Sequence, residues 1–423
     1  MTAAVTLDPV MPPHGHPTWP EARWIGMLDI DAFAPDSGGW VELVPRHAEG
    51  YRHARVLLRH RFRPITFVDA PIVDGRVRVR LPATRAHAEP EAAELPPISV
   101  VVCTRDRADA LADALVSILL LDYPDFEVVV VDNAARTDAT ARVVERLGDP
   151  RVRCVPEPVP GLSTARNAGV QAARHELIAF TDDDVVVDRY WLRAIARGFG
   201  RDSAVSCVAG LVPSGELRTA AQAYFEKRVS WAGSLAPRVV SMAMPPPDVP
   251  LFPLQVGRLG TGANFAVKKA RVLDLGGFDE ALGAGTAAQG GEDLDMFFRV
   301  VTSGDAMATE PGAIVWHRHR SDNDALLSQA RGYGLGLGAW LTKVGLDRTH
   351  RRLVARTVSR HLWLSLRTGA DYGAIVAQPS ADLRCEVPTS VGRTEVLAVL
   401  GGPRALWRGR RRRARPVAPV PVS

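Results

Sequence analysis

Three consecutive aspartates, Asp182, Asp183 and Asp184, stand at the end of an apolar run, Leu177–Phe180. Such a run is typical of a buried strand, and open α/β sheets bind their ligands beside the C-terminal ends of their strands. Adjacent carboxylates repel one another unless a cation or water screens them. The stretch therefore indicates either a cation site at a sheet edge or a solvated acidic turn.

Polar residues also follow two earlier apolar runs. Thr104 and Arg105 follow Ile98–Cys103, and Asp132 follows Phe126–Val131. Residues in these places can bind an anion at a helix N-terminus or accept hydrogen bonds from a base or a ribose, although Asp132 is equally suited to cap a helix. Neither run is followed by a GxGxxG motif or a P-loop lysine, which argues against a dinucleotide-dependent dehydrogenase and a P-loop nucleotide hydrolase.

Two side chains in Pro160–Gly169 are candidate phosphate ligands. Arg166 and Asn167 lie near the start of a helix that is expected to begin at Ser163. Taken alone, Arg166 is better explained as a solvated arginine. With a phosphate-bearing ligand at the sheet edge, both side chains become plausible donors to it.

Acidic and imidazole side chains recur downstream. Glu292 and Asp293 follow a Gly-Gly pair at the start of a predicted helix, where the helix dipole favours carboxylates and where a positioned carboxylate could also act as a general base. His317 and His319 follow a short predicted strand. An imidazole near an apolar run is often structural, but beside a carboxylate cluster it suits Mn²⁺ and, less well, Mg²⁺.

Alternating strands and helices are needed to place these groups together. Strands are expected at 98–103, 126–131, 152–155, 177–180, 204–212 and 260–267, and helices at 109–121, 137–147, 163–174, 222–231, 293–300, 326–344 and 351–367. This order predicts an α/β fold with a mostly parallel sheet and helices on both faces. Pro245-Pro246-Pro247 is expected to form a loop over the site, and the glycines between 332 and 338 are expected to permit close helix packing.

The rest of the chain divides by composition. The expected units are a flexible N-terminus (1–18), a small β-rich module (19–85), a linker (86–97), the α/β domain (98–320), a helical extension (321–378) and a flexible basic tail (379–423). In the module, Asp74-Gly75 predicts a hairpin, and Arg76, Arg78 and Arg80 are expected to share a solvated face.

Charge and cysteine usage restrict the function. Seven arginines lie between Arg404 and Arg415, and without them the formal charge falls from +5 to −2, so the fold offers nucleic acid no basic face. The four cysteines form no CxxC pair, and we expect neither a signal peptide nor a membrane span. A reducing, cytoplasmic location is therefore expected. The arginine tail is either solvated or bound at an anionic membrane.

Seven short motifs occur together in a characteristic order. They are Val100–Arg107, Val128–Asn133, Gly161–Gly169, Phe180–Asp184, Gly260–Ala266, Gly276–Glu280 and Gly291–Asp293. Residues 97–320 thereby resemble glycosyltransferase family 2, the inverting enzymes of the GT-A (Rossmann-like) fold. Thr181 departs from a common form of the family, which has an acid in its place.

The resemblance implies a role for each candidate. Thr104 and Asp132 resemble the contacts to base and ribose, and Arg166 resembles a donor-site arginine, with Arg105, Asn167 and Asp182 also on the donor side. Asp183 resembles the direct metal ligand of the DxD-type motif, Asp184 a second ligand or outer-shell residue, and His317 the histidine that completes the site; His319 is the competing choice. Asp293, with Glu292 beside it, resembles the catalytic base.

The implied activity is transfer of a hexosyl or pentosyl group from a nucleotide-diphospho-sugar to a hydroxyl of a glycan, lipid-linked or small-molecule acceptor, assisted by Mn²⁺ or Mg²⁺. A metal and Arg166 would stabilise the departing diphosphate, and a single displacement would invert the anomeric configuration. The alternative is an inactive sugar-nucleotide-binding or scaffold protein of the same fold. A nucleotidyltransferase would need a basic, glycine-rich loop in place of Cys103–Asp106.

Overall fold

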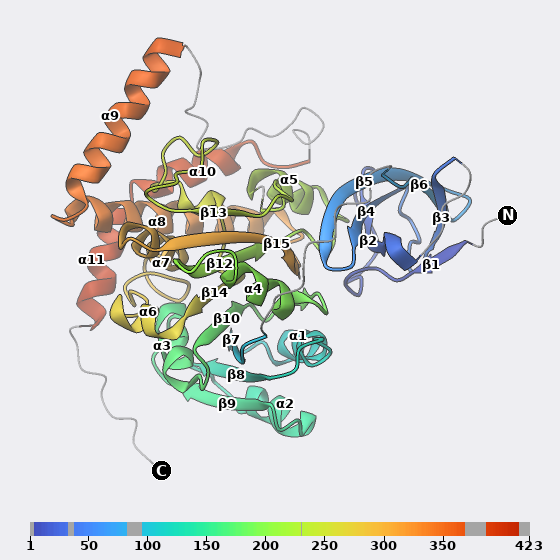
Figure 1. Cartoon of the computed structure of the whole chain (residues 1–423), viewed down its shortest axis with the longest axis horizontal. Helices are drawn as coiled ribbons and strands as arrows, with labels where there is room; N and C mark the ends of the chain where they lie inside the picture. Colours follow the sequence, from blue (N-terminus) through green and yellow to red (C-terminus); the bar gives the residue numbers. More distant parts are fainter. Residues whose placement is uncertain (1–3, 33–37, 83–94, 230, 369–385, 414–423) are drawn as a thin grey trace.

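The computed structural model describes residues 4–32, 38–82, 95–229, 231–368 and 386–413 (Figure 1). Near the N-terminus, six strands form one sheet in the order β1-β3-β6-β5-β4-β2. These strands are β1 (Val5–Leu7), β2 (Arg23–Asp29), β3 (Trp40–Pro45), β4 (His53–His60), β5 (Arg63–Val73) and β6 (Arg76–Arg80). Asp74 and Gly75 have φ of 49° and 70°, which suits the tight β5–β6 hairpin that the sequence predicts. Val77 and Val79 are buried while the three β6 arginines are exposed, so the solvated arginine face is confirmed.

The second sheet has nine strands and carries the site. Its strands are β7 (Ile98–Thr104), β8 (Phe126–Asn133), β9 (Val152–Glu157), β10 (Leu177–Thr181), β11 (Val185–Val187), β12 (Val205–Leu211), β13 (Arg238–Val240), β14 (Asn264–Lys268) and β15 (Ala306–His317). The order is β11-β15-β12-β14-β10-β7-β8-β9, with β13 beside β15. Pairs are parallel from β10 to β9, whereas β14 is antiparallel to both its neighbours. The α/β class is thus confirmed, with a mixed sheet.

Helices cover both faces of this sheet. The α-helices are α1 (Ala108–Leu119), α2 (Ala139–Leu147), α3 (Leu162–Ala172), α4 (Trp191–Phe199), α5 (Ala220–Val229), α6 (Lys269–Asp274), α7 (Glu292–Thr302), α8 (Asn323–Leu346), α9 (Arg351–Thr368), α10 (Ser390–Val399) and α11 (Gly402–Arg413), and short 3₁₀ turns lie at Ile30–Ala32 and Val256–Arg258. Val100 and Val102 of β7 pack with α1, α2 and α4, while Val101 packs with α3, α7 and α8. Alternate side chains of a buried strand therefore serve two cores. Among the described residues, no helix is long and apolar enough to cross a membrane.

The six-stranded sheet contacts the α/β part directly. Arg59 on β4 forms a buried ion pair with Asp188, which follows β11. Leu57 packs in one cluster with Leu211 and Trp316 of the larger sheet. Because a buried arginine left without its carboxylate is costly, this pairing fixes how the two sheets meet.

Both segments expected to be flexible contain regular structure in their described residues. In the expected N-terminal segment, 1–18, β1 pairs with β3, and Met11 packs in one buried cluster with Trp316. In the expected tail, 379–423, α10 and α11 are present, and residues 379–385 and 414–423 lie outside the described chain. Val391, Ala405 and Leu406 are buried there. The many arginines between 404 and 415 made the apolar positions of a helix difficult to recognise from the sequence. The linker expected at 86–97 lies mostly outside the described residues.

Glycines on α8 allow its neighbours to approach its backbone closely. A Cβ added at Gly334 would overlap the carbonyl oxygen of Glu395 on α10, and one at Gly338 would overlap that of Val399. A Cβ at Gly336 would come within 2.6 Å of the Gly290 carbonyl carbon, just before α7. The expectation of close packing is confirmed, and α8 links the C-terminal helices to the start of α7.

Gly334→Ala is expected to destabilise the protein by about 1–3 kcal/mol, because backbone at this contact cannot move aside as a side chain can. Gly345→Ala is the matched control on the same helix: its Cβ would meet nothing within 4 Å, so alanine there should be neutral or up to about 1 kcal/mol stabilising. Urea unfolding of both variants measures the difference. Equal midpoints would contradict the proposed role of the glycine contact.

Candidate functional site

One large cavity collects most of the predicted residues. It has a volume of about 1530 Å³ and lies beside the ends of β7 and β10, the start of α7 and the end of β15. Of the predicted residues, Thr104, Arg105, Arg166, Asp182, Asp183, Asp184, Glu292, Asp293 and His317 line it, whereas Asp132, Asn167 and His319 do not. Pro245–Pro247 line it as well, as the sequence predicts.

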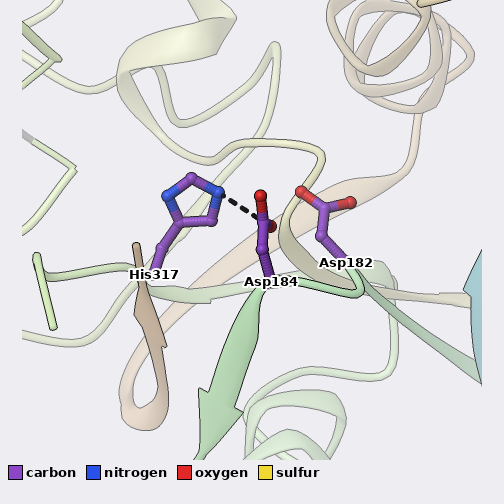
Figure 2. A group of neighbouring side chains, drawn as sticks. All are labelled: Asp182, Asp184 and His317. Carbon is purple, nitrogen blue, oxygen red and sulfur yellow. Dashed lines mark ion pairs between the residues drawn. The ribbon is translucent and has the colours of Figure 1, made fainter. Parts of the chain in front are cut away.

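Asp182, Asp184 and His317 form a group that could hold a metal ion (Figure 2). One ligand atom from each lies within 4.8 Å of the others, and His317 Nε2 is 3.3 Å from Asp184 Oδ1. Strand pairing explains the arrangement, because Val185 of β11 lies opposite His317 at the end of β15. Two carboxylates and an imidazole are a donor set that fits Mn²⁺ and can accept Mg²⁺.

Asp183 shares Arg107 with Asp184 but is not part of the group around His317. Thr104 Oγ1 donates to Asp183 Oδ2 at 2.7 Å, and Arg107 donates to Asp183 Oδ1. Asp182 and Asp184, in the bend between β10 and β11, each bring an oxygen near His317, whereas Asp183 is bonded to Thr104 and Arg107. The predicted division of roles, with Asp183 as the direct ligand, therefore does not match the group that the structure brings together.

Burial and charge perturb all four groups. Burial raises the pKa of Asp183 to about 6, against the opposing effects of Arg107 and Thr104. Burial and Asp184 raise the pKa of Asp182. Burial would also raise the pKa of Asp184, but His317 and Arg107 outweigh it and lower that pKa. In turn, Asp184 outweighs burial and raises the pKa of His317. Asp184 is thus the most readily ionised of the three aspartates, and Arg107 and His317 compensate its charge.

A buried chain of polar groups supports His317 from behind. His317 Nδ1 lies 3.0 Å from Nδ1 of His319, and His319 Nε2 lies 3.2 Å from Glu226 Oε2 on α5. His319, 2% exposed, is flanked by the rings of Phe225 and Trp231. His319 therefore holds the ring of His317 in place. Sequence reasoning missed Glu226 and Trp231, and no local motif marks either.

A closed ring of interactions holds the two acids at the start of α7. The N–H of Gly262 donates to Asp293 Oδ2 at 2.8 Å. Arg166 donates to the carbonyl oxygen of Gly262 at 2.9 Å and to Glu292 Oε1 at 2.8 Å. A single residue that precedes β14, Gly262, is thus joined to Asp293 through its N–H and to Glu292 through its carbonyl oxygen and Arg166. Burial and the adjacent Asp293 raise the pKa of Glu292 to about 7, although Arg166 opposes the rise.

Three residues predicted to bind the donor are either paired within the fold or lie outside the cavity. Arg166 is 2% exposed and its guanidinium lies over the rings of Phe265 and Phe278, so it is already paired within the fold. Asn167 exchanges hydrogen bonds with the backbone of Phe278, away from the cavity. Asp132 is buried behind the cavity-lining Asn133, and burial raises its pKa.

Arg107 is a site residue that sequence reasoning passed over. It lies on the cavity, and its guanidinium donates to both Asp183 and Asp184, at 2.9 Å in the case of Asp184 Oδ2. The signal was its position: Arg107 comes three residues after the end of a buried strand, at the N-terminus of α1.

Comparison with known proteins finds similarity to glycosyltransferases. Residues 99–243 match the family model Glycosyl transferase family 2. The chain is 27% identical over 357 residues to a pre-mycofactocin glycosyltransferase of Mycobacterium tuberculosis, which covers 79% of this chain and 70% of the relative. It is 28% identical over 306 residues to the succinoglycan biosynthesis protein ExoM of Rhizobium meliloti, covering 68% and 87% of the two chains. A mannosyltransferase from Pyrobaculum calidifontis, solved in complex with GDP-Man and Mn²⁺, superposes with a TM-score of 0.48 at 18% identity, covering 76% of this chain and 90% of that one. Residues 99–243 therefore carry a glycosyl transferase family 2 domain, and the protein is a glycosyltransferase.

Proposed function

We propose that the protein transfers a sugar from a nucleotide-diphospho-sugar to an acceptor hydroxyl with inversion, assisted by a divalent metal. The observation that carries this proposal is that the group Asp182, Asp184 and His317 lines the same cavity as Asp293. One cavity thereby offers ligands for a cation beside the diphosphate and a carboxylate for the acceptor.

Asp182, Asp184 and His317 would hold the metal, with Mn²⁺ favoured by the imidazole. When bound, the metal supplies a positive charge that stabilises the leaving diphosphate. Asp183 then has a supporting role: its bonds with Thr104 and Arg107 fix the turn that carries both ligands. His319 and Glu226 orient His317, as carboxylate–imidazole pairs commonly do behind a metal ligand.

Asp293 would accept the proton of the attacking hydroxyl. Its Oδ2 is held by Gly262 and its Oδ1 by the N–H of Leu294 at 2.8 Å, so the carboxylate is fixed before substrate arrives. Each oxygen keeps a further lone pair for the acceptor. Glu292 is bound to Arg166, which also binds the carbonyl oxygen of Gly262, and would help to hold Gly262 against Asp293.

The remaining contacts to the donor's nucleoside would come from the end of the cavity beside the ends of β7 and β8. Thr104, Arg105 and Asn133 line that end, next to the buried Asp132. Within the described chain, Asp132 Oδ1 has no hydrogen-bond partner. Because Asp132 does not line the cavity, Thr104, Arg105 and Asn133 are the residues that would contact the nucleoside.

A thermal-shift screen tests the function. Nucleotide-diphospho-sugars with Mn²⁺ should stabilise the protein, by about 2.7 kcal/mol at a hundredfold excess over Kd, and chelator should remove the shift. Asp184→Asn, which breaks the metal group, should lose the shift while still folding cooperatively. If no nucleotide sugar shifts the wild type, with or without Mn²⁺, the protein does not bind such a donor.

We also propose that α11 rests on an anionic membrane at the cytoplasmic face, which would suit a lipid-linked or polysaccharide-building acceptor. Arg404, Arg408 and Arg411 are exposed on α11 at a spacing that places them on one side, together with the half-exposed Trp407. Arg411 stacks on the Trp407 ring. An aromatic ring among arginines is the composition of an interfacial helix.

Reversing the charge of these three arginines to glutamate should abolish vesicle binding, since each basic residue near an anionic surface contributes about 1 kcal/mol. Sedimentation with phosphatidylglycerol vesicles measures the effect. The same reversal at Arg76, Arg78 and Arg80 on β6 is the matched control, because those arginines are also exposed and in line. Equal pelleting of the two triple variants would rule out the α11 surface.

A further inference from the structure

The cavity extends beyond the metal group and Asp293 along one side of α8. At 100° per residue, Gly332 and Gly336 share the side that touches the α7 turn, and Gly334 and Gly338 share the side that touches α10. Between these sides lies a third, which carries Leu337, Trp340 and Leu341, and all three line the cavity. This side of α8 is therefore next to the turn that positions Asp293.

Apolar side chains form the other walls of this extension, which we call the apolar arm. Leu251 and Leu254 from the loop after Pro250 line it, and so does Val358 of α9. Leu341 remains 37% exposed and Val358 40% exposed. Apolar surface that several elements direct into one hollow is characteristic of a ligand site rather than of scattered surface residues.

Polar groups lie where the arm meets the acids. Gln329 donates to the Tyr333 hydroxyl at 3.3 Å, and both residues line the cavity. Gln329 Oε1 and the indole N–H of Trp340 are buried and, within the described chain, have no hydrogen-bond partner. Burial raises the pKa of Tyr333, and the charge of nearby Asp293 adds to the rise. A polar head placed here would be within the field of the proposed base.

The size of the cavity leaves room for two ligands. Single small-molecule sites are commonly about 300–1000 Å³, whereas this cavity measures about 1530 Å³. The donor's nucleotide and diphosphate have polar ligands at the Thr104 end and at the metal group. Leu251, Leu254, Leu337, Leu341 and Val358, which line the apolar arm, offer a phosphate no charged partner.

We propose that the apolar arm binds an apolar aglycone: the acceptor is an amphipathic alcohol or glycoside whose hydroxyl lies at Asp293 and whose apolar part lies among Leu251, Leu254, Leu337, Trp340, Leu341 and Val358. Gln329 Oε1 and the Trp340 N–H hold its polar head. This inference rests on the proposed function, since it names the acceptor class for the same site.

Calorimetric titration with n-alkyl β-D-glucosides, from methyl to octyl and below micelle formation, tests it. Affinity should rise about threefold to fourfold for each methylene that enters the arm. Leu341→Gln and Val358→Gln should flatten this dependence on chain length, and both positions are exposed enough to tolerate an amide. Leu346→Gln is the control, because Leu346 is on the same helix, 67% exposed and outside the cavity; it should keep the wild-type dependence.

The outcomes separate this inference from the function on which it rests. If the wild type binds methyl and octyl glucosides equally, or if Leu341→Gln keeps the full chain-length dependence, the apolar arm is not an aglycone site. A donor-induced thermal shift in that case leaves the proposed function standing. If glucoside affinity depends on alkyl chain length but no nucleotide-diphospho-sugar produces a thermal shift, the assignment of the bound glucoside as an acceptor is overturned. A plateau at short chains identifies a compact aglycone, and a continued rise to octyl identifies a lipid chain.

Discussion

Asp293→Asn is expected to lower kcat by about 10²–10⁴-fold, the usual contribution of a general base, while the affinity for the donor changes little. The carboxamide cannot take the acceptor proton. It can still accept a hydrogen bond from the N–H of Gly262 or of Leu294, but not from both, so a modest loss of stability is expected as well. Steady-state turnover and donor-induced thermal shifts measure the two effects separately.

Glu292→Gln is the informative comparison for this variant. Its carbonyl oxygen can keep the bond from Arg166, and Glu292 Oε2 has no partner to lose within the described chain. A smaller fall in kcat than for Asp293→Asn is therefore expected. If Glu292→Gln is the more damaging change, Glu292 is the base, and Asp293 positions the Gly262 peptide.

Much of the site could be predicted because its residues follow strands directly. The apolar runs before Thr104, Asp132 and Asp182 are long enough to predict buried strands, and parallel strands end at one edge. The Gly-Gly pair predicted the start of α7, where Gly291 adopts a φ of 88°. Local sequence thus determined which elements meet at the cavity.

The details that local sequence could not predict are pairings between distant segments. β11 has only three residues, and only its antiparallel pairing with β15 sets Asp184 rather than Asp183 beside His317. Likewise, the local sequence around Arg166 is consistent with a solvated or a ligand-binding arginine. Only the folded structure shows that it pairs with Glu292, 126 residues away. Such contacts depend on tertiary packing, which no spacing rule encodes.

The same pairing gives a direct test of the metal site. Asp184→Asn is expected to weaken Mn²⁺ binding by more than the roughly 10–100-fold typical of losing an outer-shell partner, because it removes a ligand and the charge that His317 and Arg107 stabilise. Asp183→Asn should weaken Mn²⁺ binding by about 10–100-fold or less, since an amide can still accept the hydrogen bond from Thr104. Calorimetric titration with Mn²⁺ in the absence of substrate measures both.

The dependence on pH distinguishes a site that uses His317 from one made of carboxylates alone. Asp184 raises the pKa of His317 above its usual value, and a protonated imidazole cannot bind a metal, so Mn²⁺ must displace that proton. Affinity should therefore rise with pH as His317 loses its proton, in addition to the rise from Asp182, whose pKa is also raised, and His317→Gln should weaken binding and remove the imidazole's part of this rise. If Asp183→Asn weakens binding more than Asp184→Asn, and the full rise persists in His317→Gln, then Asp183 is the direct ligand, as the motif resemblance alone implies, and the group around His317 is structural.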